Sequence, residues 1–247
     1  MMAGYDTAGT VQGVWGSAVQ NKFGNPAFWI RYFSPSNYRP VNYSSTNANA
    51  ECHVVWTSGA KHLGCVSTPS RLDGTYADGQ AAAGTFGSAM HQVWLWVTPL
   101  HLPTNDILYC WLDQEPGYNL STSFWNGWAE RLDVWNFNNA GIYPYYPCLY
   151  CDPCNSTLNC STLRNASYAA FAIWTPDPQA KCGYTCQNPP PWAAKTCAGC
   201  GGGGSTPTKV WQFYIQYHCS SLDVDVDVGA SGFNTPSYCF YLSYDPG

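Results

Sequence analysis

Charged side chains are scarce in this 247-residue sequence: 10 Lys and Arg and 15 Asp and Glu residues make up 10%, against about 25% in an ordinary soluble domain. The basic residues form no cluster and the formal net charge is −5, so the chain lacks the basic surface that nucleic-acid binding needs. No apolar run approaches the roughly 18–20 residues that cross a bilayer. We therefore expect neither a nucleic-acid partner nor a membrane span.

Cysteine and aromatic residues are abundant, with 13 Cys, 12 Trp, 18 Tyr and 10 Phe. This much buriable apolar material excludes intrinsic disorder, and the cysteine count favours an oxidising compartment. Five N-x-S/T sequons agree with that compartment; they begin at Asn42, Asn119, Asn155, Asn159 and Asn165. We predict a secreted, glycosylated, extracellular protein. Residues 1–6 show no basic and apolar leader; either the signal peptide is not visible in this sequence or the protein is not secreted, and we favour the first.

Short apolar segments alternate with amphipathic ones along the chain. The patterns predict strands at 3–8, 28–33, 62–68, 107–115, 140–146, 169–175, 209–217 and 222–228, and helices at 47–58, 77–93 and 121–135. This alternation is typical of an α/β fold of the (β/α)8 TIM-type barrel class. No glycine-rich phosphate loop follows the first strand, which disfavours a nucleotide-binding fold. We predict a single barrel domain over 1–247.

Two Cys-rich insertions, at about 147–168 and 177–208, interrupt the predicted barrel. They hold eight cysteines: Cys148, Cys151, Cys154, Cys160, Cys182, Cys186, Cys197 and Cys200. Their C-x-x-C spacings also suit zinc, but no paired His lies nearby and we favour disulfides, which hold loops that bury no core. The connectivity stays open.

Outside the insertions, Cys52 with Cys65 and Cys219 with Cys239 are plausible pairs. Because 13 is odd, one thiol is left over, and Cys110 is the candidate. We predict no metal and no cofactor.

Asp113 and Glu115 lie at the end of the strand predicted at 107–115. Alternate strand residues share a face, so both carboxylates are expected to point into the barrel mouth with Trp111 below them. Neighbouring carboxylates in a partly desolvated site favour protonation of one of them, which is what glycoside hydrolysis requires. The alternative is a solvated strand end or a helix N-cap.

A second acidic group lies on the last predicted strand, where Asp223, Asp225 and Asp227 alternate with valines. Burying all three carboxylates without partners would cost too much, so we expect at least one to reach the mouth. An exposed polar face and a calcium-binding row of oxygens are the alternatives. Asp6 lies on the first predicted strand.

An ordered set of segments resembles a known family: 4–7 (GYDT), 30–32 (IRY), 112–115 (LDQE), 141–143 (GIY), 211–212 (WQ) and the later DVDV run. It is similar to the glycoside hydrolase family 25, lysozyme-like barrel, and more closely to the related glycoside-hydrolase-like domain of unknown function of bacteria and fungi. The resemblance covers 3–228 apart from the Cys-rich insertions. Residues 64–66 (GCV) depart from the family, whose third strand usually carries an aromatic-His pattern.

The resemblance implies Glu115 as proton donor, Asp113 as its stabilising partner and Asp6 in the cleft. It further implies a substrate-binding set, which comprises Asp225, Asp223, Tyr32, Arg31, Tyr143 and Trp211. The predicted function is a secreted lysozyme- or muramidase-like glycoside hydrolase that cleaves a β-linked, N-acetylated polysaccharide. The alternative is a non-catalytic glycan-binding module or a self-assembling building block of a glycosylated extracellular assembly.

Overall fold

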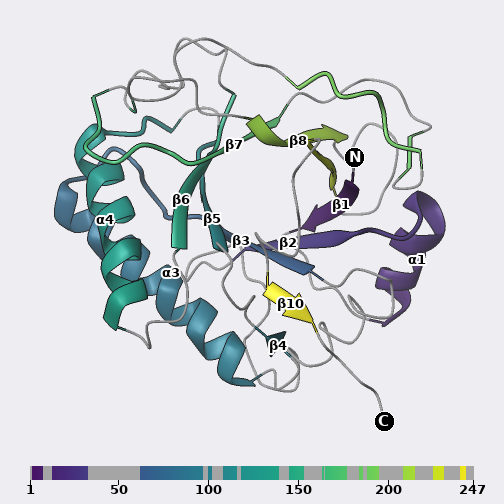
Figure 1. The fold of residues 1–247 in the computed structure, drawn as a ribbon, viewed down its shortest axis with the longest axis horizontal. Coiled ribbons are helices and arrows are strands. Elements are labelled where there is room, and N and C mark those ends of the chain that lie inside the picture. Colours follow the sequence, from purple (N-terminus) through teal and green to yellow (C-terminus); the bar gives the residue numbers. More distant parts are fainter. Residues whose placement is uncertain are drawn as a thin grey trace.

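A computed structural model describes the fold of this chain (Figure 1). The described residues are 2–7, 13–32, 62–96, 100–101, 108–115, 118–138, 145–152, 163, 165–176, 184–185, 188–194, 208–214, 225–230 and 240–242. Within this part of the chain, no helix has both the length and the apolar character needed to span a membrane.

The described elements alternate between strands and helices for most of the chain. In order they are β1 (Met2–Thr7), α1 (Gly13–Phe23), β2 (Phe28–Tyr32), β3 (His62–Ser67), α3 (Tyr76–Trp96), β4 (Leu100–His101), β5 (Leu108–Asp113), α4 (Thr122–Asn138), β6 (Tyr145–Tyr150), β7 (Ile173–Pro176), β8 (Thr208–Tyr214), β9 (Asp225–Gly229) and β10 (Phe240–Leu242). Helices α3 and α4 lie side by side at one flank of the strands, and α1 lies at the opposite flank (Figure 1).

The strand pairings return to their starting point. The sheet has the order β2-β1-β9-β8-β7-β6-β5-β3-β10-β4, and β2 also pairs with β3. Strands β1, β2, β3, β5, β6, β7 and β8 are parallel to their neighbours within this set, whereas β9 is antiparallel to both β1 and β8. The α/β class is therefore confirmed, but β9 departs from the all-parallel (β/α)8 pattern that we expected.

The sequence located most strands to within a few residues and missed several elements. Helix α1 and strands β4 and β10 were not predicted, and the predicted helix 47–58 lies outside the described residues. The prediction of a strand at 140–146 was displaced, because β6 extends to Tyr150. Residues 147–150 thus belong to the sheet, although their cysteine and proline content suggested the start of an insertion.

Among the cysteines that the structure describes, Cys110, Cys148 and Cys151 are buried free thiols, and Cys65 is buried as well. Cys110 was expected to be free, but Cys148 and Cys151 were expected in disulfides of the first insertion. Strand β6 explains why these two cysteines are not in an insertion. It carries Cys148 into the interior, and Cys151 follows it directly and is fully buried. The other insertion cysteines, Cys154, Cys160, Cys182, Cys186, Cys197 and Cys200, lie outside the described residues, as do Cys52, Cys219 and Cys239.

The interior of the strand circuit is filled mainly by large side chains. One buried cluster combines Phe28, Ile30, Val66, Tyr109, Trp111, Cys148, Tyr150, Ala172, Trp174 and Val210. The alternating residues Cys110 and Leu112 are equally buried but belong to the other face of β5. Strands buried on both faces are typical of a parallel sheet covered by helices, and this arrangement places Trp111 inside the circuit as predicted.

Helices α3 and α4 touch through their backbones. A Cβ atom added to Gly79 on α3 would overlap the backbone carbonyl oxygen of Phe124, and one added to Gly127 on α4 would overlap that of Tyr76. Two glycines facing opposite helices thus permit a separation that no larger residue allows. Large buried side chains of α4, Trp125 and Trp128, fill the space beside this crossing.

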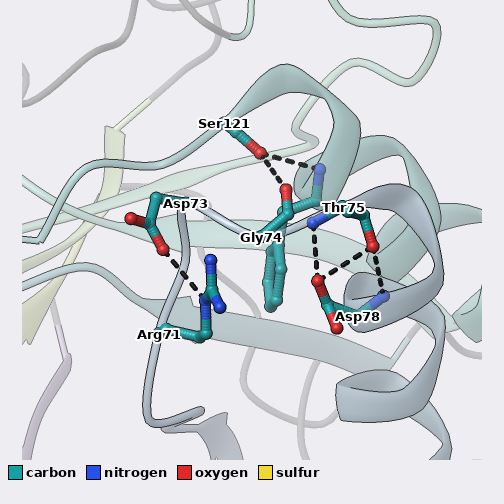
Figure 2. Close-up of polar contacts among 7 residues, drawn as sticks. Arg71, Asp73, Gly74, Thr75, Asp78 and Ser121 are labelled. Atoms are coloured by element: carbon teal, nitrogen blue, oxygen red, sulfur yellow. Dashed lines mark hydrogen bonds and ion pairs between the residues drawn. The ribbon is translucent and has the colours of Figure 1, made fainter.

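Side-chain caps fix where these two helices begin (Figure 2). Before α3, the Thr75 hydroxyl accepts from the Asp78 backbone N–H at 3.3 Å, and Asp78 Oδ2 accepts from the Thr75 backbone N–H at 2.7 Å. This reciprocal pair is a capping box, and the bonds that the Thr75 backbone N–H and hydroxyl donate to the Asp78 carboxylate lower the pKa of Asp78. Before α4, Ser121 Oγ accepts from the Phe124 N–H at 3.0 Å and donates to Gly74 O at 2.6 Å, which ties the two helix starts together.

The helix crossing gives a first testable prediction. Gly79→Ala and Gly127→Ala should each lower the free energy of unfolding by about 1–3 kcal/mol, because the helices must separate to admit the methyl group. Gly84→Ala is the matched control on α3: its Cβ would meet only Arg131 Nε, at 3.8 Å. That substitution should be neutral or stabilising by up to about 1 kcal/mol. Urea unfolding measures all three, and equal effects at Gly79 and Gly84 would contradict the close crossing.

The buried thiols give a second prediction, about pH. Burial raises the pKa of Cys110, Cys148 and Cys151 in the folded chain. Below about pH 8.5, the ordinary thiol pKa, both states keep the proton and pH has no effect through these groups. Above it only the unfolded chain ionises, so stability should fall by up to about 1.4 kcal/mol per thiol and pH unit.

Urea unfolding from pH 7 to 9.5 under reducing conditions measures this slope. The Cys110→Ala, Cys148→Ala and Cys151→Ala variants should each flatten it, because alanine has no proton to lose. A slope that is the same in these variants and in the unsubstituted chain would contradict the prediction.

Candidate active site

The parallel strands end on one side of the circuit, and β5 ends there with Asp113. Asp113 is half-buried, its Oδ1 atom is buried, and it lies in register with Tyr150, the last residue of β6. Because β9 is antiparallel, it starts on this same side with Asp225. Active sites of α/β folds lie at the carboxyl ends of their parallel strands, so this edge is the candidate site.

Glu115 lies two residues beyond Asp113 and is exposed. The expectation that both carboxylates share one inward face assumed that the strand continues to residue 115. Regular pairing ends at Asp113, so strand alternation does not determine where Glu115 points. The structure thus brings Asp113 to the end of the circuit and presents Glu115 to solvent next to it.

Four buried polar side chains, here called the inner polar group, come from the four consecutive strands β6 to β9. They are Tyr150, Trp174, Gln212 and Asp227, and each is at most 6% exposed. The Tyr150 hydroxyl donates to Gln212 Oε1 at 2.8 Å, and Trp174 Nε1 donates to Asp227 Oδ1 at 3.0 Å. The Tyr150 and Trp174 rings meet edge-on at 4.5 Å, which joins the two hydrogen-bonded pairs.

Asp227 is the most demanding member of this group because it is fully buried. A buried carboxylate is costly unless it is hydrogen-bonded, and a buried indole N–H also needs an acceptor. The bond between them gives the indole N–H an acceptor and gives Asp227 Oδ1 a donor. It also fixes the indole of Trp174, whose ring lies edge-on to Trp111 at 6.0 Å. The inner polar group therefore holds the aromatic interior in one arrangement.

The remaining predicted site residues have different placements. Asp6 is in register with both Ile30 and Asp225, and Arg31 with Thr7 and Cys65. Tyr32 is half-buried and packs against the interior cluster.

Trp211 is 1% exposed, and its ring contacts Trp192 at 6.1 Å. Its strand neighbour Val210 belongs to the interior cluster, so alternation places Trp211 on the outer face of β8.

The predicted positions Asp223 and Tyr143 lie outside the described residues, as do Asn42, Asn155 and Asn159. The other two sequon asparagines, Asn119 and Asn165, are exposed. Among the residues that the structure describes, no cluster of three or more His, Cys, Asp or Glu side chains is placed to hold a metal ion.

Sequence reasoning did not assign the inner polar group to the site. Asp227 was seen as one of three alternating aspartates, but its depth depends on the register of β9 with Gly4 and Gln212. Tyr150 was assigned to an insertion rather than to a strand. The alternation of Asp and Val along β9 indicates that Asp227 shares a face with the other aspartates. It does not indicate that Trp174 is its hydrogen-bond partner.

No family model matches this sequence, and no curated protein matches it. A solved structure of an uncharacterized B. stearothermophilus protein is similar with a TM-score of 0.68 at 22% identity, over 96% of this chain and 100% of that chain. The Clostridium perfringens spore cortex lytic enzyme SleM is similar with a TM-score of 0.57 at 13% identity, over 94% and 68%.

The modular autolysin LytC from Streptococcus pneumoniae is less similar, with a TM-score of 0.49 at 12% identity, over 92% of this chain and 47% of that chain. The B. stearothermophilus protein and SleM show that this chain shares its fold with these two proteins.

The inner polar group gives a third prediction. Asp227→Ala should lower the free energy of unfolding by about 1–3 kcal/mol, because the buried Trp174 N–H loses its acceptor. Asp227→Asn should retain most of that stability, since the amide oxygen still accepts the bond. Urea unfolding followed by tryptophan fluorescence compares the two variants. Equal losses in both would contradict the role of the hydrogen bond.

Proposed function

We propose that this chain is a secreted glycoside hydrolase of lysozyme-like type that cleaves a β-linked, N-acetylated polysaccharide. The observation that carries the proposal is the half-buried Asp113 at the carboxyl end of β5, with Glu115 exposed two residues later. Two carboxyl groups that flank the scissile bond are the minimal equipment for glycoside hydrolysis. The fold shared with a protein named as a spore cortex lytic enzyme is consistent with this proposal.

In this mechanism Glu115 donates a proton to the leaving glycosidic oxygen. Its exposure lets a polymeric substrate reach it from solvent. Asp113, closer to the interior, offsets the positive charge that develops on the sugar ring, or orients the acetamido group of the substrate for internal attack. Water then completes the hydrolysis at the anomeric carbon.

Further residues are proposed for substrate binding. Asp6 and Asp225 are register partners on β1 and β9 at this edge, which supports a place for both near Asp113. The proposal retains Asp223, Tyr32, Arg31, Tyr143 and Trp211 from the family resemblance. For Trp211 the contact with Trp192 supports an indirect role through the outer face of β8.

We further propose that the closed strand circuit is a barrel of family 25 type, with Cys-rich segments held by disulfides outside the described residues. The exposure of Asn119 and Asn165 supports glycosylation in an extracellular compartment. A glycan or polysaccharide is the proposed partner, and no cofactor takes part.

One observation favours a second candidate function. Glu115 is exposed, whereas general acids of glycosidases commonly lie in partly desolvated surroundings. A non-catalytic module that binds glycan, or assembles with copies of itself on a glycosylated surface, needs no such acid. Scarce charge and exposed sequons suit such a packed surface structure.

The fourth prediction separates the two functions. Glu115→Gln should lower kcat for the release of reducing ends from peptidoglycan by about 10²–10⁴-fold, the usual contribution of a general acid. Sedimentation with the polysaccharide should be unchanged, because the amide keeps the shape of the side chain. Asp113→Asn should likewise lower kcat.

Glu130→Gln is the matched control, because it makes the same substitution on α4, away from the strand ends. It should leave both measurements unchanged. Full activity in Glu115→Gln would reject the assignment of the acid. Sedimentation without any release of reducing ends by the unsubstituted chain would favour the binding module.

A further inference from the structure

Gln114 occupies an unusual position between the two proposed carboxylates. It is 1% exposed, whereas Asp113 before it is half-buried and Glu115 after it is exposed. The backbone N–H of Gln114 donates to Tyr150 O at 3.0 Å. That bond extends the pairing of β5 with β6 one residue beyond the end of the strand.

The side chain of Gln114 binds the segment that follows Glu115. Its Nε2 donates to Tyr118 O at 3.2 Å, and the backbone N–H of Tyr118 donates to Glu115 O at 3.2 Å. The peptide groups on both sides of Tyr118 are therefore held, one by Gln114 and one by Glu115. The bond from Tyr118 back to Glu115 joins these two residues, and Gln114 ties both of them to the end of β5.

The hydrogen bonds of the Gln114 side-chain amide indicate its role. Its Oε1 is buried and accepts no hydrogen bond from the residues that the structure describes. A buried acceptor without a donor costs stability, and an apolar side chain of the same size would avoid that cost. Methionine would fill the volume as well, so packing alone does not account for a glutamine. What methionine cannot supply is the N–H that holds Tyr118.

We infer that Gln114 is a positioning residue, which clamps Tyr118 and, through the bond from Tyr118 to Glu115, fixes Glu115 at the edge of the candidate site. The effect of this clamp on catalysis rests on the proposed function, since it acts through Glu115 as proton donor. The clamp itself does not depend on catalysis. It is a property of the bonds among Gln114, Glu115, Tyr118 and Tyr150.

Gln114→Met tests the clamp, and Gln80→Met on α3, where the amide reaches only the Tyr76 hydroxyl in an exposed pair, is the matched control. Amide hydrogen exchange at Tyr118, followed by NMR, should accelerate about tenfold or more in Gln114→Met, because the bond from Gln114 keeps Tyr118 from opening to solvent. Urea unfolding should show unchanged or increased stability, since the unpaired acceptor is gone. Gln80→Met should change neither.

Activity tests the link to Glu115. In Gln114→Met, kcat on peptidoglycan should fall about tenfold or more with KM changed less than about twofold, because a displaced acid lowers proton transfer rather than binding. An aryl glycoside with a dinitrophenyl leaving group needs no proton, so its kcat should change less than about twofold. A residue with a merely structural role would affect both substrates equally.

The outcomes separate the clamp from the proposed function. Exchange at Tyr118 that is the same in Gln114→Met and in the unsubstituted chain would overturn the clamp, whatever the activity. Equal losses on the two substrates would overturn positioning through Glu115. If the unsubstituted chain cleaves neither substrate, the proposed function fails, and faster exchange at Tyr118 in the variant still establishes the clamp.

Discussion

Strand β9 pairs with β1 on one side and with β8 on the other, antiparallel to both, and these pairings close the strand circuit. Closure leaves the seven parallel strands and β9 without a free edge among themselves, which removes unpaired backbone groups from that part of the sheet. It also brings the start of β9 to the carboxyl ends of the parallel strands. Asp225 thereby comes to the side where the parallel strands β1 and β5 place Asp6 and Asp113.

The circuit encloses aromatic side chains where many parallel sheets enclose branched aliphatic ones. Tyr and Trp carry polar atoms that need partners once buried. The Trp174 indole and the Tyr150 hydroxyl find those partners in Asp227 and Gln212. Buried Tyr and Trp side chains thus require buried polar residues on the adjoining strands. The hydrogen bonds between the two kinds of residue restrict how the rings pack. The same hydrogen bonds order the buried aromatic side chains next to the candidate site.

Three of the cysteines that the structure describes have a role in the core that the cysteine count alone does not indicate. Cys110, Cys148 and Cys151 are small apolar side chains of the core, protonated and shielded from solvent. A buried free thiol behaves as a hydrophobic residue, so these three are compatible with either redox compartment. Evidence for an oxidising compartment therefore rests on the sequons and on the cysteines of the other segments, which lie outside the described residues.

Local patterns in the sequence determined the α/β class, the positions of α3, α4 and most strands, and the placement of Asp113 at a strand end. These follow from periodicity and capping, which act over a few neighbouring residues. Tertiary structure alone decided that β9 reverses direction, that Asp227 lies beside Trp174, and that β6 takes up residues 147–150. It also decided that β5 ends at Asp113, so that Glu115 lies beyond the strand and is exposed. Each of these depends on strand register and on contacts between residues far apart in the chain, for which a single sequence carries no local signal.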